Sequence, residues 1–186
     1  MKIKNQIRLT FKTPTAINEL YRSLQIDYPK FFKMDGLSKL GFLASELILK
    51  DTENRFVPRE DIALLCFNHS SSLDMDTLFQ ETIRNNENYF PSPSLFVYTL
   101  PNIVLGEIAI RNNFFGESFC YICKKFDAHQ IIDTVKNTFY DKTITAVIVA
   151  WIEFFEEKKE VLMMLIEKND GDLEFTEEQV NKLYND

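Results

Sequence analysis

The sequence predicts an α/β protein in which a largely parallel sheet is flanked by helices. The run at 62–67 is apolar at every position, as in a central strand that is buried on both faces. Segments with strand and helix patterns also alternate along the chain, which is typical of strands joined by crossover helices. At 186 residues the chain has the length of one compact unit, so we predict a single domain over 1–186.

Local patterns define the individual elements. Ile7, Leu9 and Phe11 alternate with polar residues, as in a half-buried strand. Asp127 is predicted to cap a helix, and Thr176 with Gln179 forms a capping box for the last one. The expected helices lie at 14–24, 36–50, 74–84 and 102–111, and the other expected strands at 118–124, 144–152 and 160–167.

Composition and charge exclude several classes of partner. The net charge is −7, and no cluster of Lys and Arg is present to neutralise nucleic-acid phosphates. The same charge disfavours adsorption to anionic membranes, and we find no signal core or membrane-spanning run. Three cysteines are too few for a secreted disulfide framework. We therefore expect a cytoplasmic protein with reduced thiols that binds neither nucleic acid nor membrane.

Two motifs are better explained by structure than by a ligand. Cys120 and Cys123 form a C-x-x-C motif, and Cys66 and His69 form a C-x-x-H motif. Because side chains three residues apart on a strand point to opposite faces, Cys120 and Cys123 should diverge. We expect core cysteines, no metal and no cofactor. The acidic run at 153–160 is predicted to be a solvated turn between two strands.

Several segments resemble the N-terminal half of β-ketoacyl synthases, which have the thiolase-like fold. They are Phe31-Phe32-Lys33-Met34-Asp35-Gly36-Leu37-Ser38-Lys39-Leu40, Ser94-Leu95-Phe96-Val97-Tyr98-Thr99-Leu100-Pro101-Asn102, the helix from Ile103 to Ile110, Gly116-Glu117-Ser118, and Ala146 to Glu153. The resemblance covers about residues 1–168 and is most specific over 93–116. It implies a single thiolase-like half with a five-stranded mixed sheet flanked by helices.

The resemblance also implies where the catalytic residues of this family would stand. A ketosynthase uses a cysteine thiolate at the turn after its third strand as the acyl acceptor. Counted from Gly116, Lys125 occupies that position, and Cys123 lies two residues earlier on the strand. The family's decarboxylating histidines come from the C-terminal half, and His69 and His129 match neither of them. We therefore expect no catalytic residues, with Cys123 as the alternative acyl acceptor.

Three functions remain open after this comparison. The first is a non-catalytic 3-oxoacyl-ACP synthase-like subunit in fatty-acid, polyketide or aryl-polyene-type biosynthesis, acting like a chain length factor for an active synthase. The second is an acyltransferase or acyl-binding enzyme that uses Cys123, and the third is a structural self-association module. The first implies a homodimer or a heterodimer with a ketosynthase-like protein. An acyl carrier protein is a further candidate partner. Carrier proteins are acidic, however, so this acidic chain offers them a poor docking surface. The expected interface consists of Phe96, Tyr98, Leu100, Pro101, Asn102, Phe119 and Tyr121.

Overall fold

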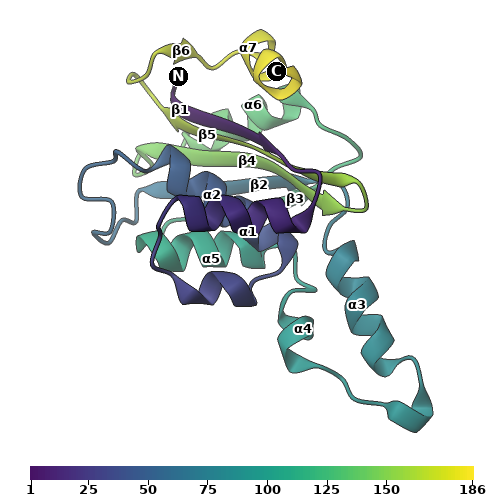
Figure 1. Cartoon of the computed structure of the whole chain (residues 1–186). Coiled ribbons are helices and arrows are strands. Elements are labelled where there is room, and N and C mark those ends of the chain that lie inside the picture. Colours follow the sequence, from purple (N-terminus) through teal and green to yellow (C-terminus); the bar gives the residue numbers. More distant parts are fainter.

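One mixed sheet with helices on both faces forms the body of the protein (Figure 1). The computed structural model describes the backbone of residues 1–186 and every side chain except that of Asn88. The strands are β1 (Lys2–Thr10), β2 (Ile62–Asn68), β3 (Ser118–Ile122), β4 (Ala146–Phe155), β5 (Lys158–Glu167) and β6 (Leu173–Glu174). The helices are α1 (Pro14–Ser23), α2 (Gly36–Ile48), α3 (Leu73–Ile83), α4 (Pro93–Val97), α5 (Ile103–Asn112), α6 (Ala128–Thr138) and α7 (Glu177–Asn185), with 3-10 turns at Pro29–Lys33 and Asn86–Asn88.

The strand order confirms the predicted fold class. The sheet runs β3-β2-β4-β5-β1-β6, with β2 parallel to both β3 and β4 and with β5 antiparallel to its neighbours β4 and β1. The five long strands are those of the predicted thiolase-like half. The described backbone adds a sixth, β6, whose two residues pair with Lys2 and Ile3 of β1. This strand was not predicted, since two residues give no periodic signal.

Local sequence signals place several helix boundaries correctly. The Asp127 carboxylate accepts the backbone N–H of Gln130 at 3.1 Å, which caps α6 as predicted. Likewise, the Thr176 hydroxyl accepts the N–H of Gln179 at 3.3 Å and opens α7. The capping side chains satisfy amide groups that have no partner inside the helix, so the helices begin where the sequence predicts.

Each face of the sheet has its own hydrophobic core. Helices α1, α2 and α5 cover one face, where Leu64 and Ile152 are buried. Helices α6 and α7 cover the other face, where Leu65 and Trp151 are buried. Alternate residues of β2 and β4 therefore point into different cores, and this explains the continuous apolar runs of both strands.

A helical arm projects from the body beyond the end of β2. It consists of residues 73–97, with α3 and α4 side by side, and it extends well past the sheet (Figure 1). Met75 is the buried residue of α3, whereas α4 has none. The rings of Phe79 and Phe96 lie 5.5 Å apart and connect the two helices of the arm. Within the described part of the chain, no helix is both long and apolar enough to cross a membrane.

The packing of α2 against α5 predicts opposite effects for two glycine substitutions. In Gly41→Ala the added methyl overlaps the side chain of Val104 on α5, so we expect a loss of about 1–3 kcal/mol in the free energy of unfolding. Gly106→Ala, in α5 itself, meets no described atom within 4 Å, so helix propensity should stabilise the protein by up to about 1 kcal/mol. Urea unfolding of both variants tests this, and equal effects would contradict the close approach of the helices.

Candidate functional site at the carboxyl edge of the sheet

The carboxyl ends of β2, β3 and β4 meet at one edge, where the turn after β3 is fixed by the end of β2. The N–H of Cys123 donates to the carbonyl of Asn68 at 2.7 Å. The imidazole Nδ1 of His69 lies 2.9 Å from the carbonyl oxygen of Cys123. Because Asp127 caps α6 on the other side, the turn at 123–127 is anchored at both ends. Lys125 lies in its middle with an exposed side chain.

Cys123 is the first residue of this turn and not part of the strand as predicted, because β3 ends at Ile122, and it is not activated there. Its Sγ is partly buried and lies 3.8 Å from the carbonyl oxygen of Tyr121. Burial, together with the negative charge of Asp127, raises the pKa of the Cys123 thiol. A raised pKa keeps the group as a thiol at neutral pH, which is the opposite of what a nucleophilic cysteine requires.

Cys66 and Cys120 form a pair across neighbouring strands. The two residues are direct partners in the parallel register of β2 and β3, and both pack on the face covered by α2 and α5. Cys123 packs on the opposite face, as the two-residue period of a strand predicts. A hydrogen bond from the Cys66 thiol lowers the pKa of Cys120, and this bond together with burial raises the pKa of Cys66.

Glu153 is a buried residue that the sequence interpretation missed. Its side chain is 0% exposed, and its carboxylate accepts the backbone N–H groups of His69 and Ser70, the latter at 3.3 Å. The prediction of a solvated turn over 153–160 is therefore wrong at both ends, because β4 continues to Phe155 and β5 begins at Lys158. The two-residue period of β4 is the sequence signal that could have located it, because this period places Glu153 on the same face as Trp151.

Asn68 completes the polar network at the end of β2. Its side chain is fully buried, its Nδ2 donates to the carbonyl of Ile152 at 2.5 Å, and its Oδ1 accepts the N–H of Ser71. Asn68 and Glu153 together satisfy three consecutive backbone N–H groups of the loop at 69–71. This loop is thereby tied to the end of β4.

A hollow of about 390 Å³ lies between this loop, the turn after β3 and α7, and we call it the basic hollow. Its lining is rich in cations and contains no carboxylate among the described side chains. The lining residues are His69, Lys124, Lys125, Phe126, Trp151, Lys158, Asn181, Tyr184 and Asn185. The ring of Phe126 stacks on that of Tyr184 with 3.7 Å between centroids, and Trp151 meets Phe126 edge-on.

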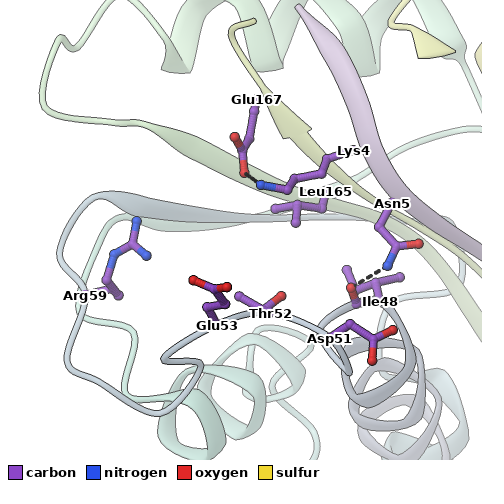
Figure 2. A pocket seen from close by; sticks show the side chains of 9 residues that line it. All are labelled: Lys4, Asn5, Ile48, Asp51, Thr52, Glu53, Arg59, Leu165 and Glu167. Carbon is purple, nitrogen blue, oxygen red and sulfur yellow. Dashed lines mark hydrogen bonds and ion pairs between the residues drawn. The ribbon is translucent and has the colours of Figure 1, made fainter. Parts of the chain in front are cut away.

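A second hollow, of about 410 Å³, lies at the other end of the strands, away from the carboxyl edge (Figure 2). Its cations are already neutralised. Lys4 contacts both Glu167 and Asp170 at 2.8 Å, and Arg59 binds Asp61 through two contacts of 2.6 and 2.7 Å. Asn5 donates to the carbonyl of Ile48 at 2.7 Å, as Figure 2 shows. This hollow therefore consists of satisfied structural contacts.

The predicted interface residues fall into two groups. Phe119 and Tyr121 lie on β3, the edge strand of the sheet; Phe119 is 52% exposed, and Tyr121 stacks on Phe67. Phe96 lies on α4 and is 54% exposed. The rest of the second group follows α4 and comprises Tyr98, Leu100, Pro101 and Asn102, of which Leu100 is an exposed apolar side chain.

Tyr98 differs from its neighbours because it is anchored to the body. Its hydroxyl donates to Glu107 of α5 at 3.3 Å, and burial together with Glu107 raises the pKa of Tyr98 to about 12. The Ser72 hydroxyl also donates to the carbonyl of Thr99 at 2.7 Å. Both bonds attach the end of the arm to the body close to the carboxyl edge.

The outer helices leave little apolar surface. On α6 the buried residues are Ala128, Ile131, Ile132 and Val135, and the exposed ones are His129, Gln130, Asp133, Lys136 and Asn137. His129 contacts Glu177 of α7 at 2.7 Å. Most of the large exposed apolar residues lie instead on β3, on the arm and at the end of α5, where Ile110 and Phe115 lie. The others are Phe32, Phe56, Val57, Leu100, Leu173 and Tyr140, the last directly after α6.

Comparison with known proteins finds likeness in structure alone. No model of a known protein family matches the sequence, and no curated protein matches it either. Among solved structures, the ishigamide ketosynthase/chain length factor matches with a TM-score of 0.73 at 14% identity, over 90% of this chain and 62% of that chain. This chain thus spans less than two thirds of the length of that protein.

Two further structures agree with the first. The complex of the ketosynthase ApeO with its chain length factor ApeC from Xenorhabdus doucetiae matches with a TM-score of 0.65 at 10% identity, over 99% of this chain and 90% of that chain. The type II PKS acyl-carrier protein in complex with its hexaketide-bound ketosynthase, AntDE:AntF, gives a TM-score of 0.63 at 11% identity, over 90% and 62%.

The network around Glu153 predicts a selective loss of stability. In Glu153→Gln one side-chain oxygen becomes an NH₂ group that faces backbone N–H donors, so we expect a loss of about 1–3 kcal/mol in the free energy of unfolding. The matched control is Glu157→Gln in the exposed turn, where the change should be within about 0.5 kcal/mol. Urea unfolding compares the two, and equal values would contradict the role of Glu153.

The cysteine pair predicts an unequal response of the thiols to pH. The alkylation of Cys120 by iodoacetamide should rise at a lower pH than that of Cys123, because the Cys66 thiol stabilises the Cys120 thiolate. Cys66→Ala removes the donor and should shift the Cys120 curve to higher pH, whereas Cys66→Ser keeps a donor and should preserve it. Peptide mass spectrometry after timed labelling measures both curves. A Cys120 curve that is the same in all three proteins would contradict the bond.

At these identities the likeness concerns the fold alone, and the protein has the thiolase-like fold found in ketosynthases and chain length factors.

Proposed function

We propose that this protein is a non-catalytic ketosynthase-like subunit that pairs with an active synthase, or with a second copy of itself, through β3 and the arm. In this role it acts as a chain length factor does, in fatty-acid, polyketide or aryl-polyene-type biosynthesis. The observation that supports the proposal most strongly is the turn after β3. Lys125 lies in this turn with an exposed side chain, and we infer that it stands at the position of the family's acyl-accepting cysteine.

The neighbouring thiol does not replace that cysteine. Cys123 lies at the start of the turn, contacts the carbonyl of Tyr121, and has a raised pKa. A thiol with these properties reacts slowly with thioesters at neutral pH. β3 and the arm still expose aromatic side chains, Phe119 and Phe96, that a partner could cover, which favours a partner subunit over an enzyme.

The edge strand β3 supports pairing across a two-fold axis. It pairs with β2 on one side and presents Ser118-Phe119-Cys120-Tyr121-Ile122 on the other, without a lysine or proline to discourage another strand. An antiparallel pairing centred on Cys120 places Phe119 opposite Tyr121 of the second copy. Aromatic pairs of this kind stabilise sheets by up to about 1 kcal/mol each.

The arm supports contact with an alkyl chain. A hollow of about 390 Å³ lies between the arm and the body, and most of its lining is apolar. The apolar side chains include Ile17, Met34, Met75, Leu78, Leu95 and Phe154. Such a lining suits a subunit that shapes the space for a growing acyl chain.

The assembly state tests the proposed pairing. Light scattering of the purified protein should give twice the 21.9 kDa mass of the chain, or a one-to-one complex when a ketosynthase of the same organism is co-expressed. Phe119→Lys and Phe96→Glu should each abolish that assembly, because they bury a charge in it. Leu173→Lys is the control. Leu173 lies on β6, the edge strand on the other side of the sheet from β3, so this change should leave the assembly unchanged.

Two results would refute the proposal. One is a monomer that forms no complex with any ketosynthase of its organism. The other is a stable acyl adduct on Cys123 after incubation with acyl thioesters, detected by intact-mass and peptide mass spectrometry. That adduct would favour the acyltransferase alternative and is expected to be absent both in the wild type and in Cys123→Ala.

A further inference from the structure

We propose that the basic hollow binds a small molecule that carries a phosphate ester. This inference does not depend on the proposed function, because it rests on side chains of this chain alone. The hollow joins four segments that are distant in sequence: the loop after β2, the turn between β3 and α6, the β4–β5 hairpin, and the end of α7. The helices and strands that precede these segments hold its lining in place.

Positive charge is concentrated in the hollow although the protein as a whole carries a net charge of −7. Lys124, Lys125 and Lys158 line it together with His69. Among the ion pairs of the described side chains, none includes any of these three lysines. Three unpaired ammonium groups around one cavity repel one another, and an anion bound between them relieves that repulsion.

Three of the nearby carboxylates are already engaged elsewhere. Asp127 caps α6, and Glu153 accepts the backbone N–H groups of His69 and Ser70. Glu160, beside the aromatic floor, contacts Arg8 at 2.8 Å. The positive charge of Lys124 and Lys125 therefore remains available to a ligand, whereas Lys158 has the exposed Glu156 and Glu157 beside it in the adjoining hollow.

The floor of the hollow offers an apolar surface beside the charge. Phe126 and Tyr184 form a stacked pair, and Trp151 is buried beneath them. The polar groups of the floor point away from a ligand, since the Tyr184 hydroxyl and the Trp151 indole N–H both donate to Glu160, at 3.2 and 3.4 Å. Burial and Glu160 raise the pKa of Tyr184 to about 12, so this hydroxyl remains a donor. Phe126 covers one face of the Tyr184 ring and the Arg8 guanidinium covers the other, 5.0 Å from its centroid, so the organic part of an ester would rest against the edges of the stacked rings.

The number of cations favours a phosphate monoester over a single carboxylate. The lining contains three lysines, and no arginine among the described residues, and each lysine acts as a point charge toward an anion. A phosphate monoester has close to two negative charges and three acceptor oxygens, which three ammonium groups from different directions can share. Asn181 and Asn185 add amide donors from α7. The volume of about 390 Å³ suits a small ester.

Calorimetry with simple probes tests this site. We expect inorganic phosphate, pyrophosphate and adenosine 5′-monophosphate to bind, the last with the highest affinity, and adenosine without a phosphate to bind at least tenfold more weakly. Trp151 is the single tryptophan of the chain and lies in the lining, so its fluorescence should change with the phosphate probes. Added NaCl should weaken the binding.

Lysine substitutions locate the binding. Lys125→Gln and Lys158→Gln should each lower the affinity for adenosine monophosphate roughly tenfold, as the loss of one charge-assisted contact does. Lys142→Gln is the control, because Lys142 is exposed before the start of β4, at the other end of the strands from the hollow. Circular dichroism verifies that each variant folds.

Three outcomes would overturn the proposal. The first is that none of the three phosphate probes binds at concentrations up to about 10 mM, well above the range of weak specific sites. The second is binding that is unchanged in Lys125→Gln and Lys158→Gln, or weakened equally in Lys142→Gln. The third is equal affinity for adenosine and its monophosphate, which would assign the hollow to the base rather than to the phosphate.

Discussion

Two buried polar side chains determine the geometry of the carboxyl edge. Glu153 of β4 and Asn68 of β2 accept the N–H groups of the loop that follows β2, and the carbonyl of Asn68 accepts the N–H of Cys123 after β3. Three strands are thus joined at one end through side-chain and backbone bonds in addition to their sheet pairing. Leaving a buried acceptor without a donor costs more free energy than one hydrogen bond contributes. This network therefore specifies a single arrangement of the loop and the turn.

This arrangement separates the two surfaces at which we place functions. On one side the turn presents Lys124 and Lys125 toward α7, and on the other β3 and the arm present aromatic side chains to solvent. A residue of the turn can therefore change without disturbing the edge strand. Under the function that we propose, this separation would let the residue at the turn differ from a nucleophile without changing the surface offered to a partner.

Much of the fold could be predicted from sequence because local signals agree with the final structure. Asp127 and Thr176 are caps in both, and the continuous apolar runs of β2 and β4 are buried on both faces. Glu153 was misassigned, since a glutamate followed by further acidic residues is usually solvated. The basic hollow was also beyond sequence reasoning, because its lysines come from separate segments and converge only after folding. The expected roles of Lys125 and of the interface residues remain predictions.

The two edge strands of the sheet differ in how readily they could pair with a strand of another chain. Beyond β1 the sheet ends in β6, two residues long, and the adjoining part of β1 carries Lys2 and Lys4 in ion pairs with Glu174 and Glu167. Charged, short edges resist the addition of another chain. A pairing through β3 uses the one receptive edge of each copy, so the joined sheet would have unreceptive strands at both ends. Such an assembly closes at two subunits and cannot extend into a fibre.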